Sequence, residues 1–336
     1  NYNWLLFRNN MKECPLIILN YLDTLDFENK DNFIARLLIQ IDNWENTNLL
    51  PYFEKYIPFE KESKGKRDNF WFYEILKKIF PINKEYGYEK MAQPILDVYE
   101  DYQFDYEFEY NLNSTIESFY KNSPKKTFEF LFSIYQQISE KTKFPYFNYE
   151  NIASSLYKSS SLPDSERSSI RNGEKNIKHY LYEFIENCDI QYIIKFYDDY
   201  KNTDDVPILK LLVKGLNINP IEHKDRVIEL IRILTEKNVF GGSDDNFQLL
   251  LRKLIGGTYE YLDDNQRKFI NNILLRIRTT YDYYIDTDSK GVKKIYLRGF
   301  GLKKYLFIKS LPIEKIKKDN TLYRTYQELQ RKFGEI

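Results

Sequence analysis

Residues 123–138 read SPKKTFEFLFSIYQQI, and this stretch decides the fold class. Its large apolar residues recur three and four positions apart, which places them on one face of an α-helix. Ser123 suits an N-cap, and Pro124 suits the first helical position because the amide there has no partner within the helix. The apolar face consists of Phe128, Leu131, Phe132, Tyr135 and Ile138. The stretch therefore predicts an amphipathic helix that buries one wide face.

The same spacing recurs along almost the whole chain, for example in the faces that begin at Phe33, Trp71, Ile177, Phe247 and Leu322. Four prolines are predicted at helix starts, namely Pro15, Pro124, Pro207 and Pro220. Helices with one apolar face and short polar connections predict an all-α fold, an irregular HEAT/TPR-like α-solenoid of antiparallel helix pairs. No strict period is present, and a compact helical bundle is the alternative.

Two stretches interrupt this pattern. Residues 153–174, ASSLYKSSSLPDSERSSIRNGE, are Ser-rich and predict a long polar loop. This loop divides the chain into an N-terminal helical-repeat half, 1–152, and a C-terminal half, 175–336. Residues 281–310 contain alternating Tyr and β-branched residues around Ser-Lys-Gly, which predicts either a small β-hairpin or an irregular insertion.

Length and composition narrow the function classes. The 336 residues exceed what a single compact core usually holds, and 42% hydrophobic residues are enough for a substantial core. Lys plus Arg equals Asp plus Glu, at 50 each, which argues against a broad nucleic-acid or membrane surface. The sequence shows no signal peptide and no apolar run long enough to span a bilayer. Cys14 and Cys188 are predicted to be reduced, buried thiols, which indicates a cytoplasmic protein.

The first residues, NYNWLLFRNN, read as the middle of a helical region, and the first residue is Asn1. We therefore expect the chain to be a fragment of a longer polypeptide. The other domains of that polypeptide are then expected to be among its binding partners.

The candidate catalytic residues are few. His179 and His223 each stand alone among charged residues, and both are predicted to be surface histidines. The pairs 241–242 and 256–257 are glycines that border helical stripes, but neither has the lysine of a phosphate-binding loop. Gly241 to Ser243 are predicted to be a helix C-terminus followed by the N-cap of the next helix. The sequence predicts no enzyme, no cofactor and no metal.

Scattered carboxylates leave a metal-dependent helical enzyme as an alternative. Asp286 and Asp288 could share a divalent cation, but a single Asp-x-Asp without further acidic ligands favours a solvated turn.

The acidic-aromatic run 99–110, YEDYQFDYEFEY, is the candidate partner-binding site. Its aromatic residues alternate with polar ones, mostly carboxylates, and this period of two suits an extended segment with one apolar and one charged face. Aromatic residues are efficient interface anchors. The alternative is that the rings pack on neighbouring repeats. The predicted partner-binding residues are Tyr102, Phe104, Tyr106, Phe108 and Tyr110.

A basic cluster offers a second alternative. Lys293, Lys294, Arg298, Lys303 and Lys304 are interleaved with aromatic residues, a combination that can contact nucleic acid. The neutral net charge and the lack of a motif favour a solvated face instead.

The C-terminal stretch GLKKYLFIKSLPI, residues 301–313, is followed by ELQRKFG, residues 328–334. These motifs resemble a segment of the C-terminal helical region in large bacterial STAND-type NTPases of the AVAST antiviral defence class. The polar stretch 164–167, DSER, is also similar to a region of such sensors.

The resemblance implies a target-sensing helical-repeat region that binds a phage protein, the candidates being structural or packaging proteins. It also implies that an effector and an ATPase lie elsewhere in the parent chain, which forms an oligomer on activation. No Walker motif is present in this sequence, so the resemblance assigns no ATP hydrolysis to this chain.

Overall fold

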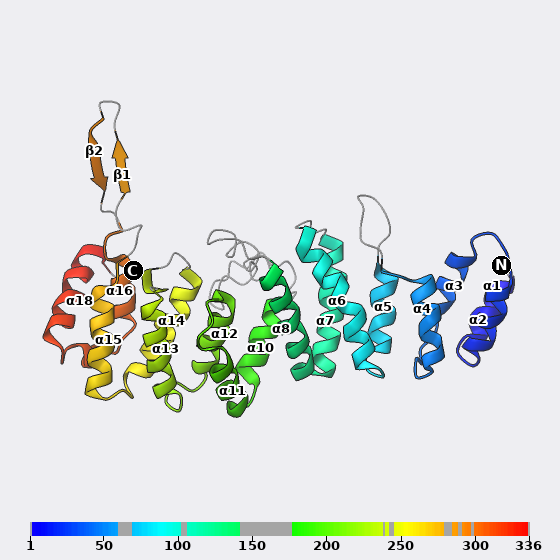
Figure 1. The fold of residues 1–336 in the computed structure, drawn as a ribbon, viewed down its shortest axis with the longest axis horizontal. Coiled ribbons are helices and arrows are strands. Elements are labelled where there is room, and N and C mark those ends of the chain that lie inside the picture. Colours follow the sequence, from blue (N-terminus) through cyan, green and yellow to red (C-terminus); the bar gives the residue numbers. More distant parts are fainter. Residues whose placement is uncertain are drawn as a thin grey trace. The chain divides into compact units, whose positions relative to one another are not determined.

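The computed structural model describes residues 2–59, 69–101, 106–141, 177–237, 239–241, 245–278, 284–287, 291–296 and 299–334. The described residues are helical apart from turns and one hairpin, which confirms the predicted all-α class (Figure 1). They form two compact units, 1–184 and 185–336, and the division falls within α10, Ile177–Asn187. Residues 153–174 lie outside the described residues, so the loop predicted between two halves stays a prediction.

Unit 1 is built from successive helices that pack on their neighbours in the chain. The described helices that precede α10 are α1 (Tyr2–Asn10), α2 (Pro15–Thr24), α3 (Lys30–Leu38), the 3-10 turn η1 (Thr47–Leu49), α4 (Leu50–Tyr56), α5 (Phe70–Ile79), α6 (Lys84–Asp101), α7 (Tyr106–Asn122) and α8 (Pro124–Lys141). Helix α5 packs against α6 and α7, and α8 packs against α6 and α7.

The core of unit 1 is rich in aromatic rings. Phe80 and Phe119 stack with 3.6 Å between ring centroids, and Tyr88 packs edge-on against both. Gly87 makes this arrangement possible, because a Cβ atom there would lie 2.6 Å from the Phe80 ring. The abundant aromatic residues of the chain therefore serve here as packing between helices.

Unit 2 continues the succession of helices. After α10 the described elements are α11 (Ile190–Tyr200), α12 (Val206–Leu216), α13 (Lys224–Glu236), the 3-10 turn η3 (Val239–Gly241), α14 (Asp245–Tyr259), α15 (Asp264–Arg276), β1 (Tyr284–Thr287), β2 (Lys293–Tyr296), α16 (Leu302–Lys309), α17 (Ile313–Ile316) and α18 (Asn320–Phe333).

The core of unit 2 is centred on α12, which packs against α11 and α14. Its buried residues are aliphatic apart from a proline and a glycine: Pro207, Ile208, Leu209, Leu211, Leu212, Val213, Gly215 and Leu216. Aspartates begin four of the helices in this unit by accepting hydrogen bonds from first-turn amides. They are Asp189, Asp205, Asp263 and Asp319.

Hydrogen bonds between helices join residues about one helix pair apart in sequence. Lys201 donates to Glu229, 28 positions away, Arg8 to Gln40, 32 away, and Lys126 to Glu85, 41 away. Separations of this size join neighbouring helix pairs, as in a stack of helices, but they follow no fixed period. Each unit is therefore consistent with a helical repeat, while the α-solenoid stays a prediction.

The predicted hairpin is present between α15 and α16. Strands β1 and β2 pair antiparallel, with Tyr284 opposite Tyr296 and Ile285 opposite Ile295. Figure 1 shows the two strands projecting from the helices of unit 2.

Two predictions of helix boundaries are wrong. The sequence predicts that the helix whose apolar face begins at Phe33 continues through Ile41 and Trp44. Helix α3 instead ends at Leu38, and Ile41 and Trp44 are buried side chains of the connection that follows it. Pro220 lies within the turn before α13, whereas Pro15 and Pro124 do begin helices. Within the described residues, no helix combines the length and the apolar character needed to cross a membrane.

Candidate functional site

The predicted partner-binding run is only partly described. Tyr102 and Phe104 lie outside the described residues, while Tyr106, Phe108 and Tyr110 belong to the first turns of α7. The extended conformation predicted for this run is therefore wrong over 106–110. The physical reason is helix propagation, because α7 is anchored further along by the buried residues Leu112, Ile116 and Phe119. The role of the run in partner binding stays a prediction.

His223 is not the surface residue predicted. Its side chain is 1% exposed, and neither ring nitrogen has a hydrogen-bond partner. Burial, followed by the charge of Arg226, lowers the pKa of the ring, so the neutral form is favoured. His179 is half-buried in α10. The burial of His223 leaves no sign in the sequence, because the residues beside it are charged.

The two cysteines are free and only half-buried. Cys188 donates to the Ile185 carbonyl, and burial raises the pKa of its thiol to about 11. The thiol is therefore protonated at neutral pH and is a weak nucleophile.

The Gly256-Gly257 pair lies within a helix and not at its border. Both residues lie inside α14, where a Cβ atom on Gly256 would come within 2.5 Å of the Ser310 carbonyl oxygen. A Cβ atom on Gly257 would lie 3.4 Å from the Pro220 ring. Gly256 thus lets the turn 310–312 approach α14 closely, whereas the turn 217–223 would be at ordinary contact distance from a side chain at position 257.

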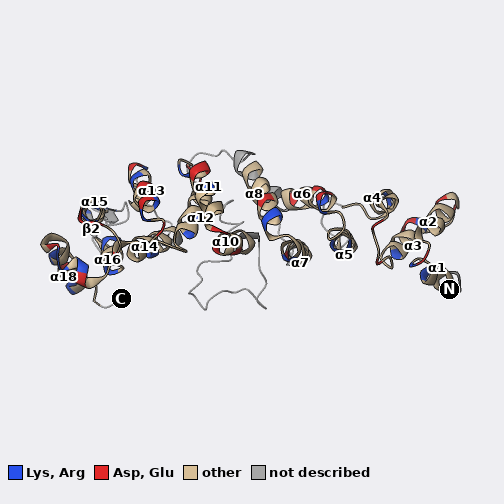
Figure 2. Cartoon of the chain, turned by 90° about the horizontal axis from the view of Figure 1, so that it is seen from below, with Lys and Arg blue, Asp and Glu red and all other residues tan. Residues whose placement is uncertain are grey.

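The structure also shows where some residues of the alternative metal site and of the alternative nucleic-acid surface lie. Asp286 lies in β1 opposite Lys294, rather than in a turn, and Asp288 is outside the described residues. Lys303 and Lys304 lie in α16. Figure 2 shows basic and acidic residues interspersed along the helices of both units.

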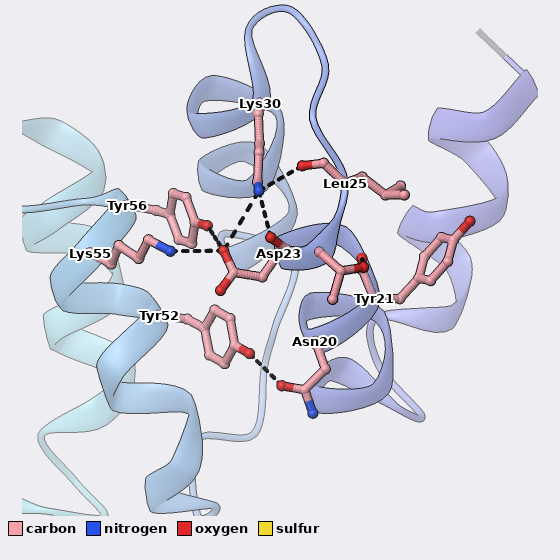
Figure 3. Close-up of polar contacts among 9 residues, drawn as sticks. Asn20, Tyr21, Asp23, Leu25, Lys30, Tyr52, Lys55 and Tyr56 are labelled. Carbon is pink, nitrogen blue, oxygen red and sulfur yellow. Dashed lines mark hydrogen bonds and ion pairs between the residues drawn. The ribbon is translucent and has the colours of Figure 1, made fainter.

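A polar cluster around Asp23 ties α2 to α4 in unit 1 (Figure 3). Its carboxylate accepts hydrogen bonds from Lys55, at 2.8 Å, and from the Tyr56 hydroxyl. Lys30 binds the Asp23 and Leu25 carbonyls, both at 2.7 Å, where the positive charge favours the C-terminal end of α2. Tyr52 extends the tie by donating to Asn20.

The hydrogen bond from Lys55, followed by that from Tyr56, lowers the pKa of Asp23. Asp23 is therefore ionised at neutral pH, and the cluster acts as an ion-paired tie between helices.

Two further carboxylates are held by a tyrosine and a lysine four positions apart on a neighbouring helix. Glu54 accepts from Tyr86 at 3.1 Å and pairs with Lys90 at 2.7 Å. In unit 2, Glu229 accepts from Tyr197 at 2.9 Å and from Lys201 at 2.7 Å. In both cases the lysine also lies over the tyrosine ring.

These clusters favour ion pairing over proton transfer. The lysine hydrogen bond is the first cause that lowers the pKa of Glu54 and of Glu229. Burial raises the pKa of Tyr86 and Tyr197. At neutral pH the carboxylates are ionised and the hydroxyls are protonated, so none of these groups has a pKa matched to acid–base catalysis. Among the described residues, no three His, Cys, Asp or Glu side chains converge as a metal site.

Exposed apolar side chains are the feature that stands out on the turns of unit 2. Ile218, Ile221 and Tyr261 are 45%, 51% and 45% exposed. The first two lie in the α12–α13 turn and the third in the α14–α15 turn. Covering such half-exposed side chains would contribute about 1 kcal/mol each. We refer to these three exposed residues, which lie on two turns of unit 2, as the turn edge.

Sequence reasoning missed the turn edge. The residues are isolated in the sequence, and their neighbours follow no period. Comparison of the chain with protein families, with curated proteins and with solved structures found no match.

Proposed function

We propose that this chain is a non-catalytic module that recognises another protein. The observation that carries the proposal is the turn edge, where large apolar side chains face water from turns held on a helical framework. Large apolar side chains exposed on a rigid framework can serve as anchors for a protein partner. The ionisable clusters described above support the same conclusion, since their groups are engaged in joining helices.

The resemblance of residues 301–313 and 328–334 makes the proposal more specific. It supports a role as the target-sensing helical-repeat region of a bacterial antiphage STAND NTPase, with a phage protein as the partner. In the structure the first of these stretches spans α16 and the start of α17, and the second is the end of α18. Tyr305 of α16 donates to the Gly334 carbonyl at 2.9 Å, so the two motifs pack together within unit 2.

Co-expression with a panel of phage structural and packaging proteins tests the proposal. The tagged chain is purified and each phage protein is quantified in the eluate. The proposal expects at least one phage protein in stoichiometric amount, and a panel without any such protein contradicts it. An unrelated helical protein with the same tag controls for retention on the resin.

A nucleic-acid-binding scaffold is the second candidate, and one observation favours it. Residues 289–313 carry no acidic residue, and their basic residues are Lys290, Lys293, Lys294, Arg298, Lys303, Lys304 and Lys309. Basic side chains beside aromatic rings bind single strands with strong salt dependence. A gel shift that is lost both at high salt and on Lys303→Glu/Lys304→Glu would support this candidate over protein recognition.

A further inference from the structure

The C-terminal part of unit 2 is strongly basic, although the net charge of the chain is zero. Residues 289–336 contain thirteen basic residues and four acidic ones. The excess persists when the count is extended back through α15, because residues 263–336 contain seventeen basic residues and nine acidic ones. Helix α15 packs against α16 and α18, and α17 packs against α18. Positive charge is therefore concentrated on helices that are in contact with one another.

The acidic residues in the described stretch 299–334 are already engaged. The three are Glu314, Asp319 and Glu328, and their side-chain partners are Lys317, Asn271 and Arg324, at 2.8, 2.7 and 3.0 Å. The same stretch contains nine basic residues, so it keeps a net positive charge. The exposed ones are Lys309, Lys317, Lys318, Arg324, Arg331 and Lys332.

The start of α16 and the end of α18 lie side by side within this region. The Tyr305 ring stacks on the Phe333 ring, with 6.0 Å between the ring centroids, and the Tyr305 hydroxyl donates to the Gly334 carbonyl. The two helix ends, residues 302–305 and 330–333, read LKKY and QRKF and contain no acidic residue. Together they bring four basic residues to one place in the fold: Lys303, Lys304, Arg331 and Lys332.

An exposed aromatic ring lies at the same place. The Phe300 side chain is 48% exposed, and the Lys332 ammonium lies 5.5 Å from the centroid of its ring. Lys332 also donates to the Phe300 carbonyl at 2.8 Å, which holds the end of α18 beside the turn that leads into α16. We call Phe300 and the four basic residues the basic end. Cations beside an exposed ring are the combination that contacts the phosphates and the bases of a single strand.

We propose that the basic end binds single-stranded nucleic acid, with phosphates at the four basic side chains and a base stacked on Phe300. The charge of the region selects a polyanion. The exposed ring selects a single strand, because the bases of a duplex are stacked on one another and do not offer their faces. This inference rests on the second candidate function and adds the site and the kind of strand to it. It is independent of protein recognition at the turn edge.

A labelled oligothymidylate of about twelve nucleotides provides the probe. Fluorescence anisotropy measures its binding to the full chain, and a duplex of the same length and a polyglutamate peptide are added as competitors. We expect unlabelled oligothymidylate to compete at least about tenfold more strongly than either of them. Absence of binding at about 50 mM salt would overturn the inference. Equal competition by the peptide would overturn it in favour of an acidic protein partner.

A charge-removing variant locates the phosphate contacts. Arg331→Gln/Lys332→Gln is expected to weaken binding at least about tenfold. It should also reduce the slope of log affinity against log salt by about 1.4, because each phosphate contact to a single strand contributes about 0.7. The matched control is Lys12→Gln/Lys121→Gln, which removes two exposed lysines of unit 1 and changes the net charge equally. Equal weakening in the control would overturn the basic end.

Two single substitutions keep the test independent of folding in the double variant. Arg331→Gln keeps the Lys332 hydrogen bond to the Phe300 carbonyl and is expected to weaken binding about threefold. Phe300→Leu keeps an apolar side chain without a ring, and is expected to weaken binding at least about threefold with an unchanged salt slope. Wild-type affinity in both variants would overturn the inference.

The outcomes separate this inference from the two candidate functions. Oligothymidylate binding that is unchanged in Arg331→Gln/Lys332→Gln and in Phe300→Leu overturns the basic end and leaves the nucleic-acid candidate standing. Binding that is weakened in these variants supports the basic end. In that case the co-expression panel decides protein recognition separately, since a panel without any partner contradicts that function and leaves the basic end supported.

Discussion

Both units contain ring pairs and capped helices, since Asn83 caps α6 in unit 1 and Phe240 packs edge-on against Phe307 in unit 2, but the two kinds of interaction are distributed differently. In unit 1 the core is dominated by aromatic rings, such as the stacked Phe80 and Phe119, and helices α2 to α5 begin without a side-chain cap. In unit 2 the central helix α12 buries aliphatic side chains, and four helices begin at a capping aspartate. Helices with the same apolar spacing can therefore be stabilised by ring packing between them, or by side-chain caps and close backbone contact.

Removal of a stacked ring is expected to have the largest effect. Phe119→Ala should lower the free energy of unfolding of unit 1 by about 3–5 kcal/mol, because the ring is fully buried and Phe80 would face a cavity. Urea unfolding monitored by circular dichroism measures the change. Trp71→Ala is the control, since that side chain is 45% exposed and should cost far less. Similar losses in both variants would contradict the aromatic core.

A methyl group at one glycine should have the next largest effect. Gly256→Ala is expected to destabilise unit 2 by about 1–2 kcal/mol, because the new Cβ atom would clash with the Ser310 backbone. Gly257→Ala is its matched control, where the neighbour is at ordinary contact distance and alanine favours the helix by up to about 1 kcal/mol. Thermal unfolding should give Gly256→Ala a lower melting temperature than the wild type and Gly257→Ala a higher one. Equal melting temperatures of the two variants would contradict the close approach of the Ser310 backbone to α14.

Loss of a cap should cost less. Asp205→Ala is expected to lower stability by about 1 kcal/mol, because the Ile208 amide loses its acceptor, while Asp205→Asn keeps an acceptor and most of the stability. In unit 1, Cys14→Ala at the start of α2, where no side-chain cap exists, should change stability by less than about 0.5 kcal/mol. The denaturant midpoints of the three variants measure these changes in stability. Equal losses in Asp205→Ala and Cys14→Ala would contradict a stabilising cap at Asp205.

The smallest expected effect depends on pH. The pKa of His223 is lowered in the folded chain, so below pH 6.5 the unfolded chain takes up a proton that the folded chain does not. The stability of unit 2 should therefore be complete above this range and should fall as the pH decreases toward the folded pKa. Melting temperatures of the wild type and of His223→Asn between pH 7.5 and about 5 measure this part of the dependence. An identical pH dependence in the variant would contradict the buried neutral histidine.

The sequence predicted the fold class because helical periodicity is a local property. The faces in α8 and α18 were identified from spacing alone, and the hairpin was indicated by alternation around Ser-Lys-Gly. The extended conformation predicted for 106–110 is wrong for an equally local reason. Its rings at 106 and 110 fit both a period of two and a helical spacing of four, and the anchoring residues that decide for the helix lie further along α7.

The candidate site could not be predicted in the same way, because it depends on which segments meet. Nothing beside Ile221 in the sequence shows that its turn packs on α14 at Gly257. The burial of His223 has the same origin, since tertiary contacts cover a side chain whose neighbours are charged. Spacing predicts faces of helices, whereas exposure at a turn follows only from the packed structure.

The central claim is that the chain recognises a protein through apolar side chains on its turns. Titration of a co-purifying phage protein into the wild-type chain and into Ile221→Ser/Tyr261→Ser, followed by calorimetry, tests it most directly. We expect saturable binding to the wild type that weakens at least about tenfold in the variant. Binding of equal strength to both chains would contradict it.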